Sequence, residues 1–329
     1  MKVAIFGAGA IGGYLGAEFA RAGIDVSLVA RGAHLEAMRR RGLVLRIAGE
    51  ERTTPVRATG DPRELGPQDY VIIALKAHSI PAALDAIAPL VDERTTIVTA
   101  SNGLPYWFFE TPGVSYQGLA LESVDPGGAQ RRRLGYARAV GCVVFPATEI
   151  VEPGVIVHEH GGRFPIGEPD GRRSERIETL HELFVAAGFE APIRDDIRDE
   201  IWLKLWGNLC FNPVSALTSA TIDVVTTDTG TRAVLVAMMD EAAAIGAKLG
   251  LRLRVEASRR LSGATALGPH RMSMLQDLEQ GRPMEVDALV GVVSELGRAT
   301  GVPTPIVDTI LALTRLRAKS VDQRRPAPH

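Results

Sequence analysis

The feature that most constrains the fold of this chain is a cluster of glycines directly after its first apolar segment. Residues 2–6 read Lys-Val-Ala-Ile-Phe, and they are followed by Gly7-Ala-Gly9-Ala-Ile-Gly12. The spacing is G-x-G-x-x-G, and a helix-like stretch, Gly12–Ala22, comes next. An apolar strand, a glycine turn and a helix in this order are typical of a dinucleotide-binding βα unit.

Each glycine of this turn is expected to serve a different structural purpose. Gly7 permits the tight turn, Gly9 has no Cβ and lets the backbone approach a pyrophosphate, and Gly12 lets the helix lie close to the strand. The free N–H groups and the positive dipole end of the helix N-terminus also favour phosphate. We therefore predict that the cofactor is bound by Gly7, Gly9, Ala10, Ile11 and Gly12.

The end of the second predicted strand, Asp25–Ala30, indicates which dinucleotide binds. An acidic residue at this place bonds the ribose 2′-hydroxyl of NAD, whereas a basic residue accommodates the 2′-phosphate of NADP. Here the strand is followed by Arg31, and no Asp or Glu stands at its end. Because a guanidinium group matches a phosphate well, NADP(H) is predicted in preference to NAD(H).

The first half of the chain alternates strand-like and helical segments. Strands are expected at Val3–Phe6, Asp25–Ala30, Tyr70–Leu75 and Thr95–Ala100, with helices at Gly12–Ala22, His34–Arg41 and Ile80–Leu90. This alternation predicts a parallel, doubly wound sheet that binds its ligand at the carboxyl ends of the strands. Two weaker strands, Leu43–Ile47 and Pro55–Ala58, are expected to form an inserted hairpin.

The pattern changes in the second half of the chain. Three strand-like runs are expected to add to the sheet as antiparallel strands, at Tyr136–Phe145, Gly154–His158 and Arg163–Gly167. The helix Ser174–Ala187 and the run Glu190–Ile193 follow, and later helices are expected at Thr231–Leu249, Arg271–Gln280, Glu285–Thr300 and Pro303–Arg317. We predict an α/β Rossmann-type dinucleotide-binding domain over residues 1–195, an all-α C-terminal domain over residues 196–329, and a frayed tail from residue 320.

Composition argues against several classes of function. The 37 Lys and Arg residues nearly balance the 39 Asp and Glu residues, so no electrostatic case exists for nucleic acid or a membrane surface. No apolar run is long enough to span a membrane. Cys142 and Cys210 lie in apolar runs, which is typical of buried reduced thiols in a cytoplasmic protein. His158-Glu159-His160 has no third ligand near it in sequence, so no metal site is predicted.

A polar stripe runs along the helix that is expected to begin near Asp196. Lys204, Asn208 and Asn212 are spaced by four residues, so they project from one face of an otherwise apolar helix. Burying an amine and two amides without partners is costly, so the stripe either faces solvent or lines a wet cleft. Pro213 is expected to kink or end the helix directly after Asn212.

Further polar residues follow strands or begin helices. Lys76 follows the third main strand and Asn102-Gly103 follows the fourth, so both are expected at the carboxyl edge of the sheet. Ser273 and Glu285 lie far downstream, near the predicted helix starts. Asn-Gly is also an ordinary turn pair, and a glutamate is favoured in the first turn of any helix.

Together these segments resemble the ketopantoate reductase (2-dehydropantoate 2-reductase) family over nearly the whole chain. The resemblance rests on four blocks: Gly7–Gly12 with Arg31; Lys76 with Asn102-Gly103; Lys204-Leu-Trp-x-Asn208-x-x-x-Asn212-Pro213; and Ser273-Met-Leu-Gln-Asp277 ahead of Gly281-Arg-Pro-x-Glu285-x-Asp287. It implies an NADP-dependent oxidoreductase that reduces a 2-keto acid to a 2-hydroxy acid. The default substrate would be ketopantoate, which gives (R)-pantoate in pantothenate biosynthesis.

The resemblance also implies roles for individual residues. Lys204 would be the general acid that protonates the carbonyl oxygen, and Glu285 would bond the substrate hydroxyl. An ammonium group stabilises the alkoxide that hydride addition creates, and an apolar helix face would lower its pKa. The other residues would hold substrate or cofactor: Asn208, Asn212 and Ser273 at the hydroxyl and carboxylate, Lys76 and Asn102 beside the nicotinamide ribose and the substrate.

Two features depart from the pattern of the pantoate-reducing members. Ile222 stands where those members carry a further asparagine, and the segment Leu104–Phe109 is unusually aromatic. These features favour an alternative interpretation, a D-2-hydroxy-acid dehydrogenase for a bulkier or aromatic acid. A non-catalytic dinucleotide-binding sensor is the third interpretation. The amphipathic helices of the second domain could support a homodimer.

Overall fold

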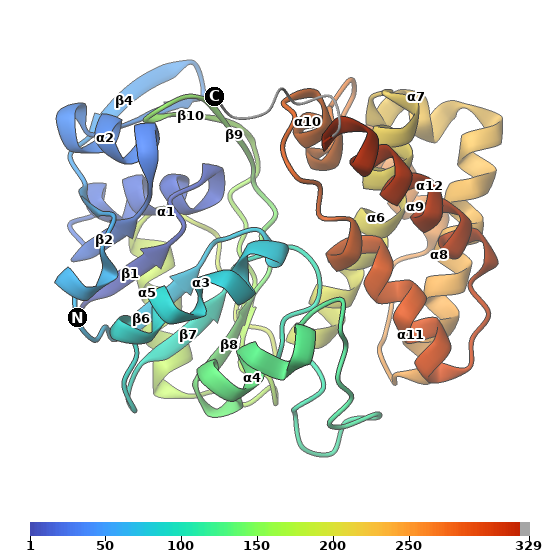
Figure 1. Ribbon diagram of the computed structural model, residues 1–329, viewed down its shortest axis with the longest axis horizontal. Helices are drawn as coiled ribbons and strands as arrows, with labels where there is room; N and C mark the ends of the chain where they lie inside the picture. Colours follow the sequence, from blue (N-terminus) through green and yellow to red (C-terminus); the bar gives the residue numbers. More distant parts are fainter. Residues whose placement is uncertain (323–329) are drawn as a thin grey trace. The chain divides into compact units, whose positions relative to one another are not determined.

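The computed structural model of this protein describes residues 1–322 (Figure 1). The chain separates into two compact units. The first contains residues 1–112 and 127–200, and the second contains residues 113–126 together with the chain from Ile201 onward. Residues 113–126, which precede the predicted boundary at residue 195, therefore group with the helical unit.

The first unit is built around a seven-stranded sheet with the order β11-β8-β7-β6-β1-β2-β5. Its strands are β1 Val3–Phe6, β2 Val26–Val29, β5 Arg57–Thr59, β6 Tyr70–Ile73, β7 Thr96–Thr99, β8 Ala139–Cys142 and β11 Ile166–Gly167. Every neighbouring pair is parallel except β8 and β11. This arrangement confirms the predicted Rossmann-type sheet, whose central strands are apolar because both of their faces are covered.

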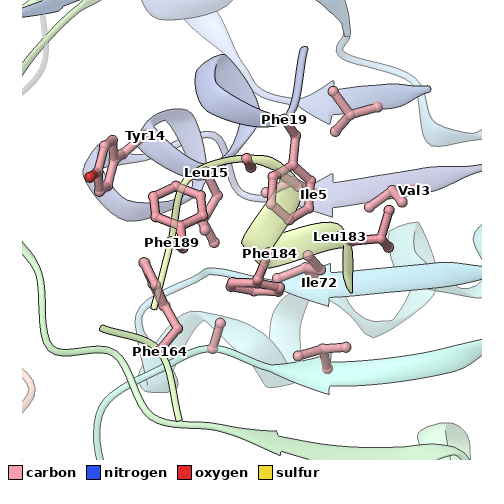
Figure 2. Close-up of a cluster of buried hydrophobic side chains, with 14 of the residues drawn as sticks. Val3, Ile5, Tyr14, Leu15, Phe19, Ile72, Phe164, Leu183, Phe184 and Phe189 are labelled. Atoms are coloured by element: carbon pink, nitrogen blue, oxygen red, sulfur yellow. The ribbon is translucent and has the colours of Figure 1, made fainter. Parts of the chain in front are cut away.

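The helices of this unit are α1 Ala10–Arg21, α2 Gly32–Arg41, α3 Ile80–Ile87, α4 Ala129–Leu134 and α5 Glu175–Ala186. Shorter helical turns are η1 Pro62–Glu64, η2 Ala77–Ser79, η3 Ala88–Leu90, η4 Pro126–Gly128 and η5 Tyr136–Arg138. Figure 2 shows the core in which α1 and α5 meet the sheet. There the rings of Phe19 and Phe184 lie 5.3 Å apart, and those of Phe164 and Phe189 lie 5.0 Å apart.

Helix α1 approaches the sheet closely through small residues. A Cβ on Gly16 would come within 2.2 Å of the Leu28 side chain on β2. Since no larger residue fits there, the glycines that follow the predicted motif hold the helix close to the strands. This close packing fixes the N-terminus of α1 at the carboxyl end of β1.

A second, four-stranded sheet has the order β4-β3-β10-β9 and corrects two predictions. Its strands are β3 Leu43–Ile47, β4 Glu50–Thr54, β9 Ala147–Glu152 and β10 Val155–His160. The predicted hairpin partner Pro55–Ala58 was wrong, because β3 turns back at Ala48 and Gly49 and pairs with β4. Both turn residues have positive φ, as the tightest hairpins require, and the chain then reaches the main sheet as β5.

The predicted antiparallel additions to the main sheet were also partly wrong. β8 is parallel to β7, and β10 lies in the second sheet, parallel to β3 and antiparallel to β9. Only the pairing of β11 with β8 is antiparallel within the main sheet as described. Apolar alternation predicts a strand but carries no information about its partner, which explains these errors.

The second unit is all helical, as predicted. Its elements are α6 Ile197–Thr218, whose first turn belongs to the first unit, α7 Ile222–Thr227, α8 Thr229–Lys248, α9 Ala257–Thr265, α10 Ser273–Glu279, η6 Asp287–Gly291, α11 Val292–Thr300 and α12 Pro305–Asp322. Pro213 was expected to kink or end α6 directly after Asn212; the helix does not end there but continues through Pro213 to Thr218. Helices α7 and α9 were not predicted.

A carboxylate of the helical unit binds residues 113–126. Glu295 on α11 accepts hydrogen bonds from the backbone N–H groups of Glu122, at 2.8 Å, and Ser123, at 3.0 Å.

The tail predicted to fray begins at Ser320, but α12 extends to Asp322. The remaining residues of that tail, 323–329, lie outside the described residues. Across residues 1–322, no helix has the length and hydropathy needed to cross a bilayer.

Candidate active site

The glycine turn between β1 and α1 forms the candidate cofactor site. Gly7 has a φ of +100°, and a Cβ on Gly12 would lie 2.1 Å from the Gly7 carbonyl oxygen. The backbone conformation at Gly7 and the close packing at Gly12 therefore require glycine at both positions, whether or not a ligand binds. A Cβ on Gly9 would meet no protein atom within 4 Å, so packing does not explain this glycine. The open space beside the N-terminus of α1, where Ala10 and Ile11 form the first turn, fits a pyrophosphate.

A cavity of about 620 Å³ opens at this turn. It lies at the carboxyl ends of β1 and β2, and its walls include Gly7, Gly9, Arg31, His34, Leu75 and Ser79. Its volume is within the range usual for cofactor sites. The cavity thus occupies the place where a parallel α/β sheet binds dinucleotides.

Arg31 and His34 mark the end of this cavity beyond β2. Arg31 is exposed and stands in the N-cap position of α2, where its guanidinium can reach a ligand in the cavity. His34 was missed by sequence reasoning, although it lies in the first turn of the helix that follows Arg31. Its Nδ1 accepts the Gly154 N–H at 2.9 Å, and burial lowers its pKa, which favours the neutral imidazole.

Lys76 and Asn102 lie at the carboxyl edge of the same sheet, as predicted from their positions after strands. Lys76 is in the N-cap position of η2, just beyond β6. Asn102 follows the neighbouring strand β7, and the φ of +87° at Gly103 confirms the turn there. The structure brings both residues to one edge, and their predicted contacts with cofactor and substrate remain predictions.

Helix α6 carries the residues that are predicted to act on the substrate. Asn208 and Asn212 are only 7% and 1% exposed, and Lys204 is partly buried. The polar stripe is therefore not a solvated helix face, which was one of the two interpretations that its spacing left open. The opposite side of α6 packs on α8, where Trp206 Nε1 donates to the Met239 carbonyl oxygen at 2.8 Å.

The environment of Lys204 changes its acidity. Burial lowers the pKa of its amine to about 8, and the positive charge of Arg260 acts in the same direction. An amine with this pKa is still mostly protonated at neutral pH, yet it releases its proton more readily than an exposed lysine. Lys204 is therefore suited to act as a general acid.

Asn212 joins α6 to the start of α10. Its Oδ1 accepts hydrogen bonds from Ser273 Oγ at 2.9 Å and from the Met274 N–H at 3.1 Å. The second bond satisfies an N–H group in the first turn of α10, which has no partner within the helix. Asn212 therefore positions Ser273, an interaction that spacing along the sequence does not reveal.

The segment between α10 and Glu285 is fixed by an ion pair. Asp277 accepts a hydrogen bond from Arg282 Nε at 2.9 Å, and the Arg282 N–H donates to the Asp277 carbonyl oxygen at 2.7 Å. Glu285 is 7% exposed and lies two residues before the π-helical turn η6. Turns of this type are frequent at functional sites. The motif residues Asp277 and Arg282 thus support the position of Glu285.

The two features that favoured an aromatic substrate are core positions. The aromatic residues of segment 104–109 are at most 7% exposed: Tyr106, Trp107, Phe108 and Phe109. Trp107 Nε1 donates to Thr99 Oγ1 at 3.1 Å, which ties this segment to β7. Ile222 is fully buried at the start of α7. Neither feature supplies an exposed apolar wall that would bind a ring.

Arg260 is the other residue that sequence reasoning missed. It lies on α9 and packs against α6, where a Cβ on Gly207 would come within 2.4 Å of its Nη2. An arginine in a polar helix normally indicates a solvent-exposed surface, so the sequence carries no local signal for this position.

Comparisons with known proteins match both parts of the chain to one family. Residues 3–106 match the family model described as "Ketopantoate reductase PanE/ApbA", and residues 196–318 match "Ketopantoate reductase PanE/ApbA C terminal". The 2-dehydropantoate 2-reductase of Mesorhizobium japonicum is 56% identical over 96% of this chain and 97% of its own length.

Solved structures share the fold over the same length. A protein from Ralstonia solanacearum MolK2 is 44% identical, with a TM-score of 0.92 over 98% of both chains. A D-mandelate dehydrogenase, solved with NADH and anilino(oxo)acetate, is 20% identical and has a TM-score of 0.85 over 98% of this chain and 99% of its own. At that identity the likeness shows the fold alone. The high identity to the Mesorhizobium relative over nearly the full length, together with the two family models, shows that this chain belongs to the ketopantoate reductase family.

Proposed function

We propose that this protein reduces ketopantoate to (R)-pantoate with NADPH. The observation that carries the proposal is the Lys204 amine, which burial makes more acidic, on a helix face shared with two buried asparagines. Family membership supplies the substrate class, because the 56% identical relative is a 2-dehydropantoate 2-reductase. A protein that merely sensed a dinucleotide would not need an acid of this kind.

The cavity beside the glycine turn supports a nicotinamide dinucleotide as the cofactor. No protein atom fills the space beside Gly9, so a pyrophosphate can approach the backbone there. Arg31 is exposed at the wall of the cavity, at the position where a 2′-phosphate would be recognised. When bound, NADPH supplies the hydride to the keto carbon. Lys76 and Asn102, at the edge of the same sheet, would orient the ribose and the substrate.

The residues of the chain itself provide the acid and the positioning. Lys204 donates a proton to the carbonyl oxygen of the keto acid as negative charge develops there, and Glu285 accepts a hydrogen bond from the substrate hydroxyl. Asn208 lies one helical turn from Lys204 and holds a substrate oxygen. Asn212 acts through Ser273, whose hydroxyl it positions.

The test is oxidation of NADPH in the presence of a panel of 2-keto acids that includes ketopantoate and an aromatic 2-keto acid. Ketopantoate is expected to give the highest kcat/KM. Lys204→Ala should lower kcat by roughly two to four orders of magnitude. The control is Lys248→Ala, which removes an exposed lysine from α8 and should leave kcat unchanged. Near-normal turnover by Lys204→Ala would refute the assignment.

The panel also separates the rival interpretations. A marked preference for the aromatic acid would favour the dehydrogenase of bulkier acids, and no oxidation with any acid would favour the sensor. A cytoplasmic location and a homodimer stay predictions.

A further inference from the structure

A partly buried arginine, Arg260, lies against the lysine-bearing helix at Gly207. On Gly207, a Cβ would lie 2.4 Å from Arg260 Nη2, 2.9 Å from Nε and 3.0 Å from Cζ. The guanidinium group therefore lies directly on the backbone of α6, and it can do so only because residue 207 has no side chain. Its Cζ also lies 5.9 Å from the centre of the Phe211 ring, one turn further along the helix. The position of this cation is thus built into the packing of α6 and α9.

This guanidinium has no anionic partner within residues 1–322. Its Nε is buried without a hydrogen bond, and no carboxylate of the described residues forms an ion pair with it. Burial lowers the pKa of Arg260 because no carboxylate offsets the loss of hydration. Removing a cation from water without a nearby anion costs free energy. A bound ligand that supplied this anion would compensate the charge of Arg260.

The surroundings of Arg260 define the anion that would fit. Gly207 follows Lys204 by three residues, so the guanidinium lies about one turn from the proposed acid, and its charge lowers the pKa of Lys204. A 2-keto acid presents a carboxylate directly next to its carbonyl oxygen, so one small molecule can meet both cations. Ser273 and Asn212 are less suited to the carboxylate, because they are neutral and bonded to each other.

We propose that Arg260 binds the carboxylate of the 2-keto acid while Lys204 donates its proton to the adjacent carbonyl oxygen. This inference rests on the proposed function and assigns a substrate-binding residue to it. A planar guanidinium matches a carboxylate through two parallel hydrogen bonds, which a lysine cannot reproduce. The arginine thereby makes the site selective for acids over neutral carbonyl compounds.

The experiment compares each 2-keto acid that the enzyme reduces with the corresponding neutral 2-keto amide. The wild-type enzyme should prefer the acid. Arg260→Ala should lower kcat/KM for the acid by about 100-fold, mainly through KM, and change the value for the amide far less. Arg260→Lys should recover only part of the preference. Arg259→Ala, which removes the exposed neighbouring arginine, should leave the ratio of acid to amide unchanged.

A second variant keeps the test valid if Arg260→Ala does not fold. Gly207→Ala retains the arginine but displaces its guanidinium, so it should lower the ratio of acid to amide in the same direction. Binding of pantoate, measured by calorimetry, gives a readout that does not depend on turnover. Its Kd should rise about 100-fold in Arg260→Ala, while the Kd of NADPH stays unchanged.

Two results would overturn the inference. One is a folded Arg260→Ala enzyme that keeps the wild-type ratio of acid to amide. The other is unchanged pantoate binding by that variant. Failure of the proposed function would look different: the wild-type enzyme would bind or reduce no 2-keto or 2-hydroxy acid, and Arg260 would then have no carboxylate to bind.

Discussion

Lys204 shows how one buried charge affects both catalysis and stability. Burial and the neighbouring Arg260 lower the pKa of the amine to about 8. The lower pKa favours proton release to a developing alkoxide. The same shift means that the folded protein holds this proton less strongly than the unfolded chain does, so the charged form opposes folding.

The first prediction concerns the pH dependence of activity. Because the proposed acid must carry its proton, kcat/KM for ketopantoate should fall as the pH rises through about 8. In Arg260→Ala the repulsion between the two positive charges is lost, so the pKa of Lys204 should rise. The decrease of kcat/KM should then occur at a higher pH than in the wild type. Rates measured between pH 6 and 10 check this. A profile with no loss of activity before pH 10 would contradict the assigned role.

The second prediction concerns stability. Lys204→Met should raise the free energy of unfolding at pH 7 by roughly 1–3 kcal/mol, because the unfavourable buried charge is removed. The pKa of Lys204 is about 8 in the folded protein and 10.5 in the unfolded chain, so the free energy of unfolding of the wild type should rise between pH 8 and pH 10.5. The difference in stability between Lys204→Met and the wild type should therefore shrink over that range. Denaturant unfolding at several pH values measures both effects. A variant that is less stable than the wild type at pH 7 would refute the explanation.

At the level of the element, α6 is the helix around which the second unit is organised. Trp202 and Trp206 pack on α8, Gly207 receives Arg260 from α9, and Asn212 holds the start of α10. The side chains of α6 therefore differ from face to face: tryptophans contact α8, a glycine receives the guanidinium from α9, and an asparagine bonds to α10.

The third prediction tests the contact between α6 and α10. Asn212→Ala leaves the Met274 N–H without its acceptor, so the free energy of unfolding should fall by about 1–3 kcal/mol. The loss of Ser273 positioning should also raise KM for the substrate more than it lowers kcat. Asn212→Asp keeps the acceptor oxygen and should retain more of the stability. Equal stability of the alanine variant and the wild type would contradict this role.

At the level of the whole molecule, the chain passes between its two units near residues 112, 126 and 200. The second unit therefore includes residues 113–126, which Glu295 holds through two backbone N–H groups. A fragment that ends at residue 195 would keep this segment but lose Glu295. Folding of the units is thus linked through the segment as well as through α6.

The fourth prediction uses the stability of the full chain to report cofactor binding. A ligand that binds only the folded state raises Tm, so NADPH should raise it more than NADH does. Arg31→Ala should reduce the shift with NADPH and leave the shift with NADH nearly unchanged. Arg40→Ala, an exposed arginine later in α2, is the control. An equal loss of both shifts in Arg31→Ala would reject the proposed contact with the 2′-phosphate.

Features that depend on local spacing could be predicted from the sequence alone. The glycine turn, the parallel strands and the Lys204 block were all identified in this way, because each is read over a few neighbouring residues. The positions of Lys76 and Asn102 followed from the rule that ligands bind at the carboxyl ends of parallel strands.

Tertiary structure alone decided which distant segments meet. Strand β10 pairs with β3 instead of joining the main sheet, α6 continues through Pro213, and the aromatic residues of segment 104–109 become core. The same holds for Arg260, whose importance depends on Gly207 more than fifty residues earlier. The sequence by itself determined the local elements and the chemical groups they carry. Burial, and with it the acidity of Lys204, arises only when non-local neighbours exclude water.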